Sequence, residues 1–217
     1  AVMKDPTTYE HVNPELVGNN RKILVSNQAG KSNLLSRLKS IGMEIDNDDK
    51  RINTLLDIVK EREYMGYSYD GAGASFEILA KNVLDQVPSF FSVENYEVTI
   101  TGSKDESSLS KANISLNVDE RIINSTGEGN GPVNALDNAL RKDLGIYNQY
   151  IQDLTLVDYK VRILDGGTEA ITRVVIESSD SKNQSWFTVG ISPNIIEASF
   201  EALMDSINYK LIKSDIK

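Results

Sequence analysis

The sequence predicts an α+β fold: a small helical subdomain followed by a duplicated βββα domain, in which two three-stranded units each carry one helix. Two observations predict it. Hydrophobic residues first recur at helical spacing, and from about residue 90 they alternate with polar residues as they do in strands. Three strand-like runs, a turn containing proline and a helix then occur twice, about 62 residues apart. Neither copy can cover both faces of its own sheet, so we expect the two copies to pack together as one domain.

Three segments follow one another along the chain: a linker segment over residues 1–30, the helical subdomain over 31–88 and the duplicated domain over 89–217. Prolines and a Gly-Asn-Asn run make the first segment irregular, and its one strand candidate covers residues 22–26. The segment begins without a capped element, as a fragment of a larger protein would. We therefore expect it to follow a domain that is not in this sequence.

The helical subdomain is expected to contain three helices. Apolar residues keep helical spacing over 32–41, about 47–66 and about 72–87, and the proline at 88 stops the third run. Asp48 and Asp49 stand at the start of the second helix, where short acidic side chains cap free amides and complement the helix dipole.

The duplicated domain is expected to contain two sets of strands. The runs lie at 96–100 and 114–118 in the first copy, with a short third strand before a glycine turn, and at 154–164, 170–178 and 184–191 in the second. The glycine-containing links at 102–106 and 165–167 are typical of turns. The last helix is expected to end near Lys213.

The turn before the first repeated helix is the stretch around which this domain is organised. Glycine occupies every second position over residues 127–131, and Pro132 follows at the first position of a helix that Gly145 is expected to end. The second copy has a similar arrangement, with Ser192 as the expected cap and Pro193 in the first turn.

A helix that starts in this way presents unpaired amides and the positive end of its dipole, which favour a carboxylate or a phosphate. The two starts could therefore frame one small-ligand site, or two sites in a dimer. The alternative is that no ligand binds and that the glycines only allow each helix to pack tightly against its sheet. The candidate binding residues are Gly127, Gly129, Asn130, Gly131, Pro132, Val133, Ile191, Ser192, Asn194, Ile195 and Ile196.

Composition excludes several classes of function. The net charge of -9 and the pI of about 4.7 make nucleic acid and anionic membranes unlikely partners. No apolar run reaches the roughly 18 residues of a membrane span, and no signal peptide is present, so we expect a cytoplasmic protein. The chain has no cysteine and a single histidine, His11, which leaves no thiolate or histidine-pair metal site.

Other motifs favour structural roles. The run Gly30-Lys31-Ser32 lacks the first glycine of a phosphate-binding loop, because Val25 stands in its place. The acidic residues Glu61 and Glu63 are interpreted as solvated charges on a polar helix face. The only tryptophan, Trp186, is expected in the core or at an interface.

The glycine turn carries a family resemblance. The motif Gly127-x-Gly129-Asn130-Gly131-Pro132-x-x-Ala135-Leu136, inside a doubled βββα unit, resembles the C-terminal regulatory domain of the 2-isopropylmalate synthase and citramalate synthase family. The stretch 9–33 is similar to the segment that follows the catalytic barrel in such enzymes, and 66–77 to the helical subdomain of the citramalate branch.

The resemblance implies a function that the residues alone do not show. Family members condense acetyl-CoA with a 2-oxo acid in a metal-dependent barrel, which this sequence lacks, so the chain by itself is expected to be inactive and to hold no cofactor. The duplicated domain would dimerise and bind the end-product amino acid, isoleucine in the citramalate branch, with pyruvate as the oxo acid. Tyr9 and His11 would lie near the neighbouring active site.

Two alternatives remain open. Leucine replaces isoleucine as the effector if the chain belongs to the 2-isopropylmalate synthase branch. A purely structural dimerisation module, without a ligand, would need the same duplicated fold. Ligand binding separates these interpretations, since all of them include a homodimer.

Overall fold

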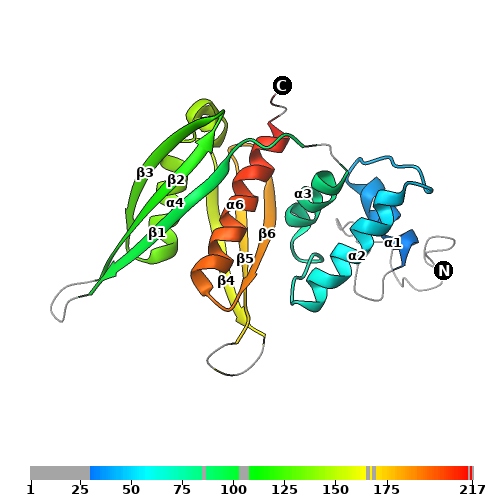
Figure 1. The fold of residues 1–217 in the computed structure, drawn as a ribbon, viewed down its shortest axis with the longest axis horizontal. Helices are drawn as coiled ribbons and strands as arrows, with labels where there is room; N and C mark the ends of the chain where they lie inside the picture. The colour runs from blue at the N-terminus through cyan, green and yellow to red at the C-terminus, as the bar shows by residue number, and fades with distance from the viewer. Residues whose placement is uncertain are drawn as a thin grey trace.

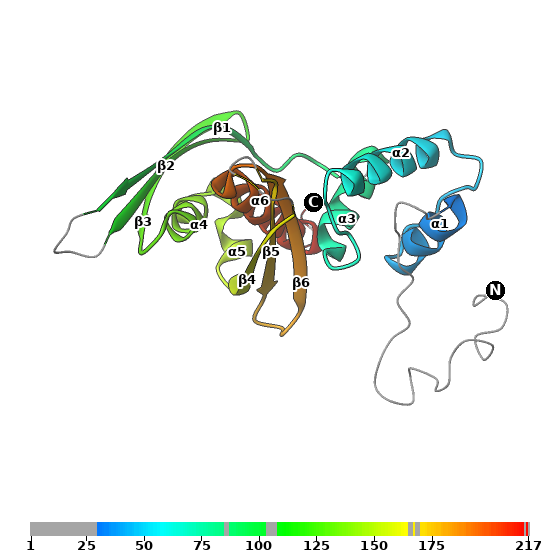
Figure 2. The same ribbon diagram turned by 90° about the horizontal axis from the view of Figure 1, so that it is seen from below.

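The computed structural model describes residues 30–84, 87–102, 108–164, 167, 170–214 and 216, and it has the predicted α+β architecture. Figures 1 and 2 show its layers along the long axis: a three-stranded sheet, a layer of helices, a second three-stranded sheet and the helical subdomain. No helix in this part of the chain is long and apolar enough to cross a membrane. The strand expected at 22–26 lies outside the described residues.

The helical subdomain contains the three predicted helices: α1 (Lys31–Ser40), α2 (Lys50–Tyr64) and α3 (Gly73–Val83). As predicted, Asp49 caps α2, with its carboxylate accepting a hydrogen bond from Arg51 N at 2.8 Å. The buried faces of the helices share one apolar cluster, which includes Leu38, Leu55 and Phe76. Helix α3 ends at Val83, a few residues before the proline that was expected to stop it.

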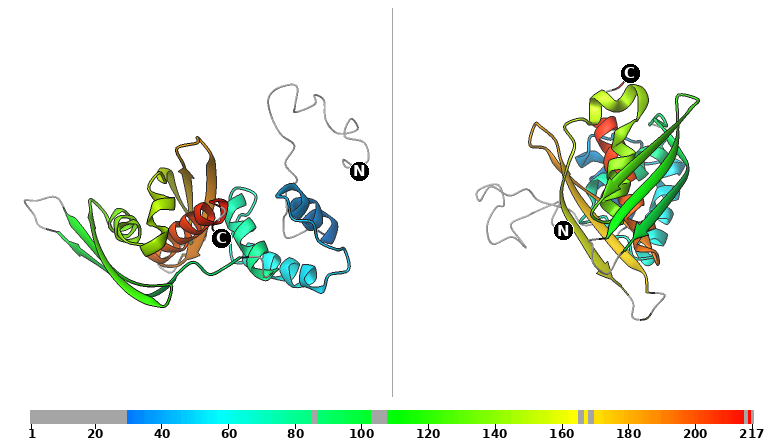
Figure 3. Two further views of the ribbon diagram at one scale, coloured as in Figure 1. Left: turned by 90° about the horizontal axis from the view of Figure 1, so that it is seen from above. Right: turned by 90° about the vertical axis from the view of Figure 1, so that its left-hand side faces the viewer.

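The first repeated unit is an antiparallel sheet, β1 (Ser92–Thr101), β2 (Leu109–Val118) and β3 (Arg121–Gly129), followed by α4 (Pro132–Lys142). Alternate β2 residues are buried beneath α4, among them Ala112, Ile114 and Leu116. The opposite face is mostly polar but includes the exposed side chains of Leu109 and Ile122, and Figure 3 (right) looks onto it with no described helix covering the strands.

The second repeated unit follows a short helical connection, η3 (Gly145–Tyr147) and α5 (Asn148–Ile151). Its strands are β4 (Thr155–Ile163), β5 (Thr172–Ser179) and β6 (Ser185–Ser192), and its helix is α6 (Ile195–Lys213). Both α4 and α6 lie between the two sheets, and the two units contribute to one apolar core. Residues of the two copies therefore pack against one another around this shared core.

The duplication is visible in individual contacts, with a spacing of 63 residues. Ser125 Oγ donates a hydrogen bond to Ala139 O, and Thr188 Oγ1 donates the matching bond to Ala202 O. The first strand of each unit has an irregularity at the same place, between Val93 and Asn95 and between Leu156 and Asp158. In both units, equivalent residues therefore connect the last strand to the helix that follows it.

The glycines of the repeat have a packing role. A Cβ added to Gly127 would overlap Ala135 O and Ala139 N, and one added to Gly190 would overlap Ala198 O. The last strand of each unit therefore approaches the backbone of its helix too closely for any side chain. This role does not exclude a ligand at the helix start, which depends on the residues that follow.

Two predicted helix ends are corrected by the structure. Asn194 rather than Ser192 caps α6, because its Oδ1 accepts from Ile196 N, and Pro193 precedes the helix. Ser192 Oγ instead accepts from Asn194 N and donates to Glu197. The first repeated helix, α4, ends at Lys142 and not, as was predicted, at Gly145.

Trp186 is in the core, as predicted. It is 7% exposed and its Nε1 donates to Ser206 Oγ at 3.2 Å. Helix α6 ends at Lys213, also as predicted, and with 19 residues it is longer than α4 with 11. The additional turns contact α3, so that α6 packs against elements from three layers.

Candidate functional site

The start of α4 has no side-chain cap. Gly131 stands at the N-cap position in an extended conformation, and Pro132 occupies the first turn. A Cβ on Gly129 would lie 2.7 Å from Ala135 N, so the chain passes very close to the first turn of the helix. Amides at such a start, together with the helix dipole, favour an anionic group.

A hollow of about 480 Å³ opens beside this helix start. It is open to solvent and lies between one side of α4 and the beginning of β4, which belongs to the other repeated unit. Its lining residues are Val133, Asn134, Asp137, Arg141, Leu154, Thr155, Leu156 and Tyr159. The lining therefore combines apolar side chains with polar ones, among them one acidic and one basic side chain.

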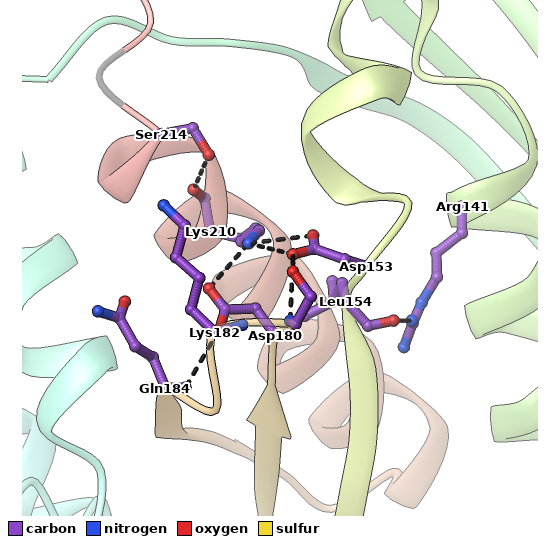
Figure 4. Close-up of polar contacts among 9 residues, drawn as sticks. Arg141, Asp153, Leu154, Asp180, Lys182, Gln184, Lys210 and Ser214 are labelled. Atoms are coloured by element: carbon purple, nitrogen blue, oxygen red, sulfur yellow. Dashed lines mark hydrogen bonds and ion pairs between the residues drawn. The ribbon is translucent and has the colours of Figure 1, made fainter.

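The two charged side chains are partly buried and paired. Arg141 Nε donates to Asp137 Oδ1 at 2.7 Å, and Arg141 Nη1 donates to the carbonyl oxygen of Leu154, a contact drawn in Figure 4. Burial raises the pKa of Asp137, and the guanidinium of Arg141 partly offsets this. Among the described residues no hydrogen bond ends on Asp137 Oδ2, so this oxygen can accept one from a ligand.

Tyr159 connects the hollow to α6. Its hydroxyl lies 2.7 Å from Ser199 Oγ, and Ser199 Oγ donates to Ile195 O at 2.6 Å. Because the hydrogen of Ser199 is used in that second bond, the hydroxyl of Tyr159 is the donor in the first. A molecule that contacts Tyr159 is therefore one hydrogen bond away from Ser199, the fifth residue of α6.

A buried hydroxyl without a partner lies near the same turn. Ser110 faces Gly129 in the register of β2 and β3, and it is 0% exposed. Its Oγ makes no hydrogen bond within the described part of the chain. A buried hydroxyl of this kind is uncommon, because its desolvation is not compensated.

The predicted binding residues do not all meet at this hollow. Val133 lines it, and the residues from Gly127 to Pro132 form the end of β3 and the adjoining turn. Ile191 instead packs against the helical subdomain, on the other face of the second sheet. Ile196 enters the shared core, and Ile195 is 42% exposed at the start of α6. Tyr9 and His11 lie outside the described residues.

Sequence reasoning missed most of the lining. Asp137 and Arg141 were detectable as a charged pair four residues apart on one side of a predicted helix. Leu154, Leu156 and Tyr159 carried no such signal, because only the packing of the second unit against α4 brings them to the site.

A second polar cluster lies at the far end of α6 (Figure 4). Lys210 Nζ is 2.9 Å from Asp180 Oδ2 and 3.1 Å from Asp153 Oδ1. Hydrogen bonds from Ser181 and Lys210 lower the pKa of Asp153 to about 2, despite some desolvation. These charges satisfy one another, so we assign the cluster a structural role that joins α6 to the start of β4 and to the turn between β5 and β6.

The fold and the helix start define the class of protein. The family described as LeuA allosteric (dimerisation) domain matches residues 70–211, and the chain belongs to this family. The family described as homocitrate synthase post-HMGL domain-like matches residues 1–64. The resemblance that the glycine turn suggested is therefore confirmed.

Several curated relatives are described as (R)-citramalate synthases. The chain is 47% identical to an (R)-citramalate synthase of Aquifex aeolicus, over 99% of this chain and 41% of that protein. It is 45% identical to the (R)-citramalate synthase of Geobacter sulfurreducens, again over 99% of this chain and 41% of the relative. For the (R)-citramalate synthase of Streptomyces coelicolor the identity is 40%, over 100% of this chain and 41% of the relative. The chain thus spans about two fifths of the length of the relatives it matches.

Proposed function

We propose that this chain is the regulatory portion of a citramalate synthase-like enzyme and that it binds isoleucine as a feedback inhibitor. The observation that carries the proposal is the hollow beside the uncapped start of α4, which combines apolar walls with an available carboxylate oxygen. An amino acid has the matching groups: an anionic carboxylate, a cationic ammonium and an alkyl side chain.

Each group of the effector has a suitable counterpart. Its carboxylate would accept hydrogen bonds from the free amides of the first turn of α4, after Gly131 and Pro132. Its ammonium would donate to Asp137 Oδ2, which lies in the same wall. Its alkyl chain would contact Val133, Leu156 and other apolar lining residues. Burial of the alkyl chain supplies affinity, and the two charged groups supply orientation.

The choice between isoleucine and leucine depends on the shape of the apolar part. Moving one methyl group changes binding by only about 1 to 3 kcal/mol in a hydrophobic pocket. Similarity to the (R)-citramalate synthases favours isoleucine. Leucine remains the alternative effector, and a dimerisation module without a ligand is the alternative function.

We also propose that the chain forms a homodimer through apolar residues that its own helices leave uncovered. Ile100 on β1 and Val161 and Ile163 on β4 lie opposite buried residues of the neighbouring strand, on the helix-facing side of each sheet. They are nevertheless 57%, 41% and 65% exposed. A second copy of the chain would cover them. In such a dimer, the start of α6, with Ser192, Asn194 and Ile195, remains a candidate contributor to the effector site.

Catalysis belongs to another part of the proposed full-length enzyme. Condensation of acetyl-CoA with pyruvate would require a divalent metal and the coenzyme. The described residues contain no group of three or more His, Cys, Asp or Glu side chains that could hold a metal ion. We propose that the metal and the coenzyme are bound by that other part and that the contribution of this chain is regulation of the acyl transfer.

Isothermal titration of the purified chain with isoleucine, leucine and valine tests the proposal. We expect saturable binding with isoleucine preferred, and at least a 10-fold loss of affinity in Asp137→Asn. Asp119→Asn, in the turn between β2 and β3, is the matched control and should bind as the parent does. Preference for leucine would change the branch. Absence of binding by a folded dimer, measured by analytical ultracentrifugation, would leave only the assembly function.

A further inference from the structure

Helix α6 presents a row of polar side chains to the helical subdomain. Glu201, Asp205, Tyr209 and Lys213 are spaced four residues apart, which places them on one side of the helix. Lys213 Nζ forms an ion pair with Glu77 of α3 at 2.8 Å. The row therefore lies along the boundary between the duplicated domain and the three preceding helices, where Figure 3 (left) shows α6 beside α3.

Glu201 forms the first of two bridges in this row. Its Oε1 accepts a hydrogen bond from the Tyr67 hydroxyl at 2.5 Å, and its Oε2 accepts one from the backbone amide of Ile191 at 2.9 Å. One carboxylate thus joins the helical subdomain, α6 and strand β6. Charge-assisted bonds of this length are among the stronger hydrogen bonds in proteins.

Asp205 forms the second bridge, one helical turn further on. Its Oδ2 accepts from Ser75 Oγ at 2.6 Å, and Ser75 Oγ accepts from the backbone amide of Val189 at 3.0 Å. Strand β6 is at the edge of its sheet, so these amides have no neighbouring strand to bond. The two bridges satisfy alternate amides of this edge, and they do so with groups from α6 and the helical subdomain.

The same helix contacts the proposed effector site near its start, just before the two bridges. Ser199, two residues before Glu201, receives the hydrogen bond of Tyr159 from the lining of the hollow. The ring of Phe200 contacts that of Tyr96 in the first unit, with centroids 4.4 Å apart and planes inclined by 30°. A helix is stiff along its axis, so a displacement of the first turn moves Glu201 and Asp205 with it.

We propose that the Tyr67–Glu201–Ile191 and Ser75–Asp205 bridges transmit occupancy of the effector site through α6 to the helical subdomain. The inference rests on the proposed function, and it adds the route by which binding acts at a distance. A shift of about 1 Å is enough to break a short hydrogen bond, so the bridges exist in a made and an unmade state rather than a continuum. The effector would favour one of these states.

Hydrogen exchange of the whole chain, with and without saturating isoleucine, tests this route. We expect isoleucine to change the exchange of the amides in residues 67–80 and of Val189 and Ile191. In Tyr67→Phe, which removes one hydroxyl, isoleucine should bind within about threefold of the parent affinity, but the change in residues 67–80 should be lost. Ser75→Ala should behave in the same way. Tyr64→Phe is the matched control, since Tyr64 is 90% exposed, and it should respond as the parent does.

The outcomes of these experiments distinguish a failure of the proposed route from a failure of the proposed function. Isoleucine binding without any exchange change in residues 67–80 of the parent would overturn the route and leave the proposed function intact. An undiminished exchange change in both bridge variants would also overturn it. Absence of isoleucine binding to the folded parent, in the titration that accompanies the exchange, would overturn the proposed function and this inference with it.

Discussion

Replacement of Asp205 by asparagine should change how the stability of the protein depends on pH. Burial of this carboxyl in the bridge to Ser75 raises its pKa from the ordinary 3.8 to about 7. The hydrogen bond from Ser75 and the charge of Arg62 oppose the rise, whereas the nearby carboxylate of Glu201 adds to it. The folded protein therefore holds a proton on Asp205 at pH values where the unfolded chain has already lost it.

The sign and size of the change in stability follow from this difference between the folded and unfolded pKa of Asp205. A folded-state pKa above the unfolded value contributes stability that is complete below about pH 4 and is lost as the pH rises through 7. At about 1.36 kcal/mol for each pKa unit, the loss between pH 4.5 and pH 8 is roughly 3 kcal/mol. Asparagine has no proton to lose, and its carbonyl oxygen can accept the same hydrogen bond from Ser75.

Urea denaturation at pH 4.5, 6 and 8 measures the effect. The free energy of unfolding of Asp205→Asn, relative to the parent, should rise by roughly 3 kcal/mol between the lowest and the highest pH. Glu63, whose pKa burial raises to about 7, titrates in both proteins and cancels in the comparison. Asp57→Asn, at an exposed position of α2, is the control and should show no such trend. An equal difference between variant and parent at pH 4.5 and pH 8 would refute the reasoning.

Three further changes test the packing and the site. Gly190→Ala should lower the free energy of unfolding by about 3 kcal/mol or more in urea denaturation, because the new Cβ would overlap a backbone carbonyl of α6. Lys210→Met should cost about 3 kcal/mol by the same measurement at pH 7, because it removes the cation that pairs with Asp153 and with the Asp180 side chain, which is 5% exposed. Tyr159→Phe should leave stability within about 1 kcal/mol of the parent, since it removes a single hydrogen bond, and it should weaken the exchange response to isoleucine in residues 67–80 more than it weakens binding in titration.

Matched variants make these results interpretable. Gly73→Ala, where an added Cβ meets nothing within 4 Å, should be tolerated, in contrast to Gly190→Ala. Lys182→Met, an exposed lysine in the adjoining turn, should leave stability unchanged, in contrast to Lys210→Met. If either control were as destabilising as its partner, the clash or the buried ion pair would not explain the loss. An exchange response in Tyr159→Phe equal to that of the parent would remove Tyr159 from the route.

Interactions between residues that are close together in the chain determined much of the fold. The three helices of the subdomain, the six strands and the two repeated helices appear near the predicted positions, because each has its own apolar periodicity and its own turn residues. The repeat could also be predicted from the sequence. In each unit the last strand approaches the backbone of its helix so closely that only glycine fits, at Gly127 and at Gly190. Caps were less predictable. Ser192 and Asn194 are both good capping residues, and the hydrogen bond of Ser192 to Glu197 decided between them.

The sequence by itself determined the class of fold, the duplication and the uncapped start of α4, because these depend on residues close together in the chain. Only the tertiary structure decided where the hollow beside α4 lies and how α6 is tied to the helical subdomain. The hollow needs Asp137 from one unit and Tyr159 from the other, and the bridges join Tyr67 to Glu201, which is 134 positions away. No pattern among neighbouring residues in the sequence indicates such pairs, because their contact results from the packing of whole layers.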